Sequence, residues 1–284
     1  MNKITLLINC EDQPNIIASV TNFMADNKGN IVYIDQHVDR EQNIFFMRLE
    51  CEFDSKTFSI ENFKTSFNNA LVEKFKLKWR MYAAERKPRM ALFVSKYDHC
   101  LYDILGRYNS GELFLEIPFI LSNHNDLKPI ADSFNIPFYH VPVTKDTKQK
   151  AELKQLELLE SYKIDFIVLA RYMQIISNLL IDKYQNKIIN IHHSFLPAFV
   201  GAKPYHSAYK RGVKIIGATS HYITEELDAG PIIEQDVAHV SHSYSINDLI
   251  SKGRDLEKIV LSNAIKLHAN RKVMVFNNKT VIFS

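Results

Sequence analysis

An amide, an imidazole and a carboxylate occupy two short polar segments of the sequence. Asn190 and His192 lie two residues apart in the segment Asn-Ile-His-His-Ser-Phe-Leu-Pro, so in an extended chain their side chains point to the same face. Asp228 lies in a separate Leu-Asp-Ala-Gly-Pro-Ile turn and can join them only through the fold. These three groups suit the formation and collapse of a tetrahedral carbon next to a carbonyl. The residues therefore indicate transfer of an acyl or formyl group.

Alternating strands and helices are predicted to position these side chains. Strands are expected at 90–95, 113–122, 138–141, 165–170 and 188–191, and helices at 97–108, 126–134 and 148–162. An antiparallel pair at 214–224 and 231–240, a helix at 245–269 and a terminal β pair around residue 277 follow. Apolar strands that alternate with helices predict a mostly parallel sheet covered by helices. Asn190 and His192 fall at a strand's carboxyl end, where open α/β sheets bind ligands.

The first 84 residues have a different pattern. Strands are expected at 3–9, 30–37, 43–53 and 75–83, and amphipathic helices at 15–27 and 58–74. The order βαββαβ predicts an antiparallel, ferredoxin-like sheet with both helices on one face. A charged segment with a proline, Glu85-Arg-Lys-Pro-Arg, ends this pattern. The expected domains are therefore 1–84 and 85–284, in an α/β protein.

Composition and charge exclude several classes of protein. The net charge of +3 is too small to indicate a nucleic acid or an anionic membrane as a partner. The lysine-rich stretch 145–154 is interpreted as the solvated start of a helix. Three cysteines lie far apart without the spacing of metal ligands. We expect a cytoplasmic protein with no metal and no membrane segment.

Two resemblances extend these predictions. The βαββαβ unit, with the turn Asp12-Gln-Pro-Asn-Ile, resembles the ACT domain, a regulatory module that often binds amino acids. Asn15 replaces the glycine usual at that point, and asparagine tolerates a left-handed backbone. The resemblance implies an amino-acid effector and a homodimer or homotetramer. The alternative is a scaffold that only makes oligomer contacts.

The remaining 200 residues resemble the Rossmann-like formyltransferase fold of enzymes that use 10-formyltetrahydrofolate. Asn190-Ile-His192, Pro197 and the segment 227–232 match that family's motifs, and 190–209 is similar to the formyltetrahydrofolate deformylases in particular. The resemblance implies that Asp228 activates water, that His192 and Asn190 stabilise the oxyanion, and that folate is the substrate with no further cofactor. His193, His206 and His221 are expected to have supporting or packing roles.

A folate pocket is expected beside these groups. The segment 170–177 resembles the loop that holds the pterin ring in formyltransferases, which implies a wall made of Met173, Gln174, Ile175 and Ile176, with Leu227 opposite. The alternative is a helix start whose Met and Ile side chains belong to the core. Arg171 and Lys203 are expected, from charge alone, to meet the glutamate tail.

The acceptor of the formyl group is a separate question. The ribonucleotide transferases of this fold carry a glycine-rich phosphate loop after their first strand, whereas this chain has the bulky segment 95–100. Water is therefore the expected acceptor, and hydrolysis supplies formate for purine synthesis and balances the one-carbon pool. The alternatives are transfer to glycinamide ribonucleotide, or an amino-acid-responsive regulator that merely binds folate.

Overall fold

The computed structural model describes residues 2–197 and 204–284, apart from the side chain of residue 204. Contacts within the chain divide it into two compact units, which are described separately. Unit 1 comprises Met1–Lys87, Arg271–Met274 and Val281–Ser284, and unit 2 comprises Pro88–Asn270 and Val275–Thr280. The boundary after residue 84 stays a prediction, and grouping by contacts adds 85–87 and two C-terminal segments to unit 1.

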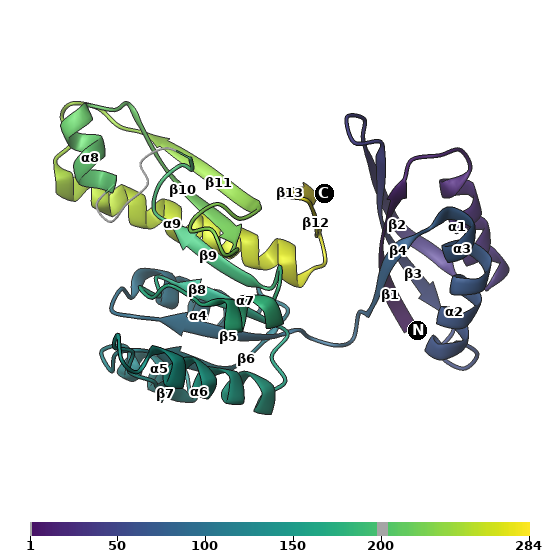
Figure 1. Ribbon diagram of the computed structural model, residues 1–284, viewed down its shortest axis with the longest axis horizontal. Coiled ribbons are helices and arrows are strands. Elements are labelled where there is room, and N and C mark those ends of the chain that lie inside the picture. Colours follow the sequence, from purple (N-terminus) through teal and green to yellow (C-terminus); the bar gives the residue numbers. More distant parts are fainter. Residues whose placement is uncertain (1, 198–203) are drawn as a thin grey trace. The chain divides into compact units, whose positions relative to one another are not determined.

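Unit 1 is an antiparallel sheet with helices on one side (Figure 1). Its strands are β1 (Asn2–Glu11), β2 (Asn30–Asp39), β3 (Ile44–Phe53) and β4 (Lys78–Ala83), in the order β2-β3-β1-β4. Its helices are α1 (Ile16–Asp26), α2 (Ile60–Phe67) and α3 (Glu73–Phe75), the last two joined by a π-helical segment, Asn68–Val72. The predicted βαββαβ order is confirmed.

The turn before α1 has the predicted left-handed backbone. Asn15 adopts φ 72° directly before the helix begins. Ile16, Val20 and Met24 then follow at helical spacing and are all buried against the sheet. The asparagine thus performs the conformational task for which a glycine is the commoner choice.

Unit 2 is a seven-stranded sheet in the order β11-β10-β9-β8-β5-β6-β7. Its strands are β5 (Arg89–Val94), β6 (Glu116–Ser122), β7 (Phe138–His140), β8 (Phe166–Ala170), β9 (Ile188–His192), β10 (Ile215–Tyr222) and β11 (Ile232–His239). Its helices are α4 (His99–Asn109), α5 (Lys128–Ser133), α6 (Lys148–Ser161), α7 (Asn178–Lys183), α8 (Pro204–Arg211) and α9 (Ile246–Ala269). A hairpin of β12 (Val273–Phe276) and β13 (Lys279–Ile282) follows.

The predicted mostly parallel sheet is confirmed. Strands β5 to β9 pair in parallel, and β10 pairs antiparallel with both β9 and β11. The sequence did not predict α7 and α8, which have six and eight residues. Helices this short offer too few turns for a clear apolar period.

Different helices cover the two faces of this sheet. Ile167 and Leu169 share a buried cluster with residues of α6 and α7. Phe166, which precedes Ile167 in the strand, packs on His268 of α9, with the centroids of the two rings 4.6 Å apart. Since successive side chains of a strand point to opposite faces, α9 lies across the sheet from α6 and α7.

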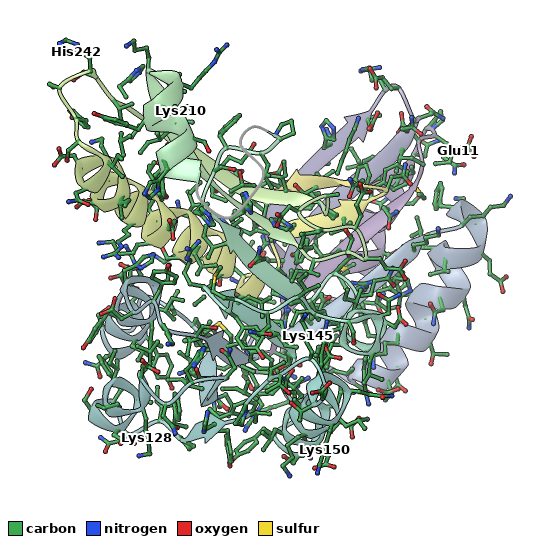
Figure 2. All side chains as sticks on the ribbon, turned by 60° about the vertical axis from the view of Figure 1, so that its left-hand side comes forward. Glu11, Lys128, Lys145, Lys150, Lys210 and His242 are labelled. Atoms are coloured by element: carbon green, nitrogen blue, oxygen red, sulfur yellow. The ribbon has the colours of Figure 1, made fainter. Side chains whose placement is uncertain are left out.

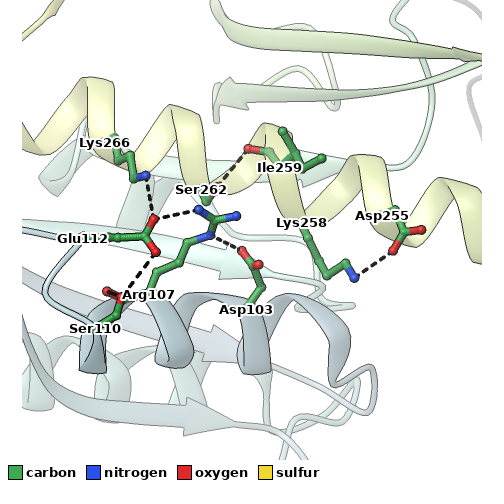
Figure 3. A network of polar contacts seen from close by, with 9 residues as sticks. All are labelled: Asp103, Arg107, Ser110, Glu112, Asp255, Lys258, Ile259, Ser262 and Lys266. Atoms are coloured by element: carbon green, nitrogen blue, oxygen red, sulfur yellow. Dashed lines mark hydrogen bonds and ion pairs between the residues drawn. The ribbon is translucent and has the colours of Figure 1, made fainter.

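Polar contacts join α4 to α9 at the surface (Figure 3). Arg107 of α4 donates to Asp103 at 2.8 Å and to Glu112 at 2.9 Å, and Lys266 of α9 donates to Glu112 at 3.1 Å. Exposed ion pairs of this kind contribute about 0–1 kcal/mol each. The buried residues of α4 and α9 therefore provide most of the packing energy.

The lysine-rich stretch 145–154 forms the exposed approach to α6 and its first turns. Lys145, Lys150 and Lys154 are exposed, and Figure 2 shows Lys150 at the edge of the molecule. Lys154 pairs with Glu157 at 2.9 Å. None of the helices in the described part of the chain is long and apolar enough to cross a membrane.

The connection between β10 and β11 requires a glycine at position 230. A Cβ atom there would lie 1.8 Å from the carbonyl oxygen of Tyr222, and backbone cannot move aside as a flexible side chain can. We predict that Gly230→Ala lowers the free energy of unfolding by about 1–3 kcal/mol, measured by urea denaturation.

Gly106→Ala is the matched control, because nothing lies within 4 Å of a Cβ atom at this exposed position in α4. There we expect no loss, or a gain of up to about 1 kcal/mol from helix propensity. Equal stability of the Gly230→Ala variant and the wild type would contradict the prediction.

Candidate functional site

A cavity of about 410 Å³ lies at the carboxyl ends of β8 and β9. The structure brings all eight predicted site residues to its wall. They are Met173, Gln174, Ile175, Ile176, Asn190, His192, Leu227 and Asp228. His192 Nδ1 lies 3.3 Å from Asp228 Oδ1, which brings the two separate polar segments into contact.

Strand pairing explains why the polar groups meet. Asn190 pairs with Leu169 of β8 on one side and with His221 of β10 on the other, and His192 pairs with Thr219. Paired residues share a face of the sheet, so these side chains all point the same way. Asn190 Nδ2 lies 3.3 Å from His221 Nε2 as a result.

His221 is therefore part of the site, although its sequence context indicated only a supporting or packing role. Its Nε2 lies 3.7 Å from Asp228 Oδ1, and its Nδ1 lies 2.9 Å from the carbonyl oxygen of Tyr222. A carbonyl only accepts, so Nδ1 carries a proton. Nε2 faces both the Asn190 amide and the Asp228 carboxylate, and its contact with the amide orients Asn190.

Asp228 stands between two imidazoles at the mouth of the β10–β11 turn, with a left-handed backbone at φ 56°. Hydrogen bonds from His192 and then His221 outweigh the effect of burial and hold the pKa of its carboxyl well below the ordinary value. The carboxylate is consequently ionised throughout the neutral range.

The wall segment 171–177 is a loop whose two ends are held from the core. The backbone N–H of Met173 donates to Ser95 Oγ at 2.9 Å, and that hydroxyl donates to Asn123 Oδ1 at 2.6 Å. At the far end the N–H of Ser177 donates to the buried Glu152 at 2.9 Å. The loop is thereby fixed without being buried.

Apolar side chains from this loop and from the β10–β11 turn remain exposed at the cavity. Met173 is 50% exposed, Ile175 64% and Leu227 63%. Ile176, in contrast, is buried in the cluster under α6 and α7. Three of these positions thus offer apolar surface to a flat ring and do not belong to the core, which disfavours the alternative of a helix start packed inward.

His193 follows β9 and contacts both the cavity and the α9 side of the sheet. Its ring stacks on His192 with centroids 5.2 Å apart, and its Nδ1 accepts a hydrogen bond from Arg171. Burial, and then the charge of Arg171, lower the pKa of His193 to about 4. His193 is therefore neutral at physiological pH.

Arg171 lines the cavity, and its guanidinium is held against groups of the protein. Its side chain is 10% exposed, and its Nε lies 3.5 Å from Glu257 Oε2. Lys203, the other residue expected near the tail, and the motif residues 198–202 lie outside the described part of the chain.

One further cluster carries the ligand types that metals prefer. His99, Cys100 and Glu257 place potential ligand atoms within 4.8 Å of one another. Both oxygens of Glu257 already have partners, His99 at 2.8 Å and the Tyr205 hydroxyl at 2.7 Å, and the Arg171 cation lies beside them. This arrangement neutralises the carboxylate internally, which disfavours a cation there.

Comparison with known proteins assigns both units. Residues 88–265 match the formyl transferase family model, and residues 4–57 match the ACT domain model. The formyltetrahydrofolate deformylase of Synechocystis sp. is 50% identical, with 99% of this chain and 98% of the relative covered. That of Bacillus subtilis is 45% identical, over 100% and 94% of the two chains.

A solved structure agrees over the whole chain. The crystal structure of a formyltetrahydrofolate deformylase from Pseudomonas syringae pv. tomato is 46% identical in sequence and superimposes with a TM-score of 0.96. The match covers 100% of this chain and 95% of the other. The chain belongs to the formyltetrahydrofolate deformylase family. It is therefore an enzyme of that family, with an ACT domain and a formyltransferase domain.

Stability should depend on pH through His193. Its pKa is about 4 in the folded protein and near 6.5 when unfolded, so the unfolded state binds more protons between these values. Stability is therefore lost as pH falls through this window, by up to about 3 kcal/mol from this residue. Urea denaturation at pH 7, 5.5 and 4.5 measures it.

His193→Gln should show a shallower decline than the wild type, because glutamine does not titrate. His242→Gln, at an exposed position between β11 and α9, is the matched control and should follow the wild type. Parallel curves for the His193→Gln variant and the wild type would contradict the assignment.

Proposed function

We propose that the protein hydrolyses 10-formyltetrahydrofolate to formate and tetrahydrofolate. The observation that carries this proposal is the convergence of Asn190, His192 and an ionised Asp228 on one cavity, in a chain of the formyltetrahydrofolate deformylase family. The exposed apolar wall of Met173, Ile175 and Leu227 beside them suits the faces of a pterin ring.

Water attacks the formyl carbon, and its carbonyl oxygen becomes an oxyanion. Asn190 and protonated His192 donate to that oxygen, and Asp228 orients the water. The low pKa of Asp228 makes its carboxylate a weak base, so it takes the proton late, as the attacking water becomes acidic with formation of its C–O bond.

Collapse of the tetrahedral intermediate breaks the bond between carbon and N10. His192 gives its Nε2 proton to the departing nitrogen and is reprotonated from water, while its Nδ1–H stays on Asp228 Oδ1 and Asp228 returns its own proton to water. The intermediate releases formic acid, which loses its proton to water, so the products are formate, tetrahydrofolate and one proton. The proposed mechanism uses no metal and no cofactor beyond the folate substrate.

The surroundings of Ser95 favour water over glycinamide ribonucleotide as the acceptor. The segment after β5 contains no glycine, its Ser95 hydroxyl is engaged with Met173 and Asn123, and the ring of Tyr97 packs under Arg171 at 4.9 Å. This segment offers no closely approachable backbone for a phosphate. In the cell, the reaction would supply formate for purine synthesis and free tetrahydrofolate for one-carbon balance.

The first test is an assay of Asp228→Asn. Asparagine keeps the shape but removes the charge, so we expect turnover of 10-formyltetrahydrofolate to fall by about 10²–10⁴-fold. Release of formate and tetrahydrofolate is measured with and without glycinamide ribonucleotide.

Asp255→Asn, at an exposed position of α9, is the control and should retain wild-type turnover. Turnover only in the presence of the ribonucleotide would make the protein a transferase. Tight folate binding without any turnover by the wild type would favour the regulatory alternative.

The ACT domain is proposed to bind an amino acid, such as glycine or methionine, and to tune the hydrolase within a homodimer or homotetramer. A cavity of about 430 Å³ supports this proposal, because Asp12, Asn15 and the start of α1 line it. The Asp12 carboxylate suits an ammonium group, and the N–H groups of a helix start suit a carboxylate.

Isothermal titration with glycine and methionine tests the effector site. We expect saturable binding that Asp12→Ala abolishes, together with a change in turnover at saturating amino acid. Asp39→Ala, a change at a half-buried position at the end of β2 that does not line the cavity, should leave binding intact. Absence of binding heat and of any kinetic effect would leave the domain a scaffold for oligomer contacts.

A further inference from the structure

A second charged network lies behind the proposed catalytic groups, on the α9 side of the sheet. Its centre is Glu257, which is 1% exposed and whose two oxygens contact His99 and Tyr205. Burial acts to raise the pKa of Glu257, but the bond from His99 and the charge of Arg171 outweigh it, so that the pKa lies below the ordinary value. Glu257 is therefore a buried anion.

Arg171 is the cation that this anion balances. Its left-handed backbone, at φ 61°, follows β8 directly, and its guanidinium lies over the ring of Tyr97, 4.9 Å from the centroid. Besides Glu257, it contacts Nδ1 of His193. A guanidinium has donors only, so this contact requires a lone pair on Nδ1. The ring proton of His193 must then reside on Nε2.

His193 thus lies between two charged clusters, one around Arg171 and Glu257 and the other around Asp228 and His192. On one side it contacts Arg171 from the β8 loop, with Glu257 of α9 and Tyr205 of α8 close by; the rings of His193 and Tyr205 are 6.1 Å apart. On the other side its ring lies nearly parallel to that of His192, at an interplanar angle of 15°. His192 in turn contacts Asp228.

We propose that Arg171, neutralised by Glu257, keeps His193 as a neutral Nε2–H imidazole, so that the positive charge beside Asp228 is confined to His192. His193 is then a positioning residue. If both rings were imidazolium, their charges would repel at this distance. This repulsion would favour loss of the proton from His192, the ring that must donate to the oxyanion. The effect on catalysis rests on the proposed function, whereas the charge state of His193 does not.

The packing around Tyr205 supports the view that this polar network is a specific feature of the fold. A Cβ atom at Gly253 of α9 would lie 2.1 Å from the Tyr205 hydroxyl, so α9 leaves room for this ring to reach Glu257. Removing one member of a buried charge network leaves its partner uncompensated. The members of the network therefore act together, and their effect at the cavity is to set the protonation state of His193.

Direct observation of His193 tests the charge state. In ¹⁵N-histidine-labelled full-length protein, with the His193 signals identified from their loss in His193→Asn, we expect the Nε2–H tautomer from pH 5 to pH 8. An Nδ1–H tautomer, or a titration midpoint above about 6, would overturn the proposal. This result holds whether or not the protein turns over the folate.

Activity as a function of pH tests the consequence. Arg171→Met removes the cation but leaves Glu257 and the burial of the ring, so the pKa of His193 should rise from about 4 toward its ordinary value. We expect kcat/KM to acquire a new acid limb, falling at least about twofold more than in the wild type between pH 8 and pH 5. The double variant Arg171→Met/His193→Asn should lack this limb.

Glu257→Gln is the matched control, because it disturbs the same network while keeping the cation. It should show no new acid limb. A loss in Arg171→Met that is equal at every pH, or a limb that persists in the double variant, would overturn the proposal. If circular dichroism shows that Arg171→Met does not fold, the wild-type spectra and Glu257→Gln decide. An inactive wild type with neutral His193 would refute the proposed function alone.

Discussion

The contact between His192 and Asp228 is the interaction on which the rest of the site depends. It joins a residue at the end of β9 to one in the turn after β10, so it exists only if β10 pairs antiparallel with β9 and the turn folds back over the strand ends. The left-handed backbone of Asp228 and the absence of a side chain at Gly230 make that return possible. Local backbone geometry thus determines the charge at the centre of the cavity.

The charged side chains in this part of the molecule form two clusters of opposite charges, one at the cavity and one in the core. Asp228 stands with His192 and His221 at the cavity, and Arg171 stands with Glu257 in the core. Neither group is stable alone in a medium of low dielectric, because an uncompensated buried charge costs several kcal/mol. The neutral ring between them allows both to persist without sharing protons.

Much of this arrangement could be predicted from the sequence, because it follows from periodicity and motif. Alternation along β9 placed Asn190 and His192 on one face, and the alternation of strands with helices placed them at the ligand-binding edge. His221 and the pair of Arg171 and Glu257 were beyond such reasoning. Their roles depend on the register between two strands and on the rotation of α9 about its axis, which no local pattern encodes.

The role of the segment after β5 bears on which molecule accepts the formyl group. In a phosphate-binding version of this fold, the segment after the first parallel strand serves the substrate. Here Ser95 instead connects Asn123 to the backbone of Met173, and so supports the loop whose apolar side chains remain exposed at the cavity. The single hydroxyl proton of Ser95 is engaged with Asn123, so the hydroxyl cannot also donate to a phosphate oxygen. The anchored loop and a segment without a phosphate cradle are therefore two results of one local structure, and both support the proposal of a small acceptor such as water.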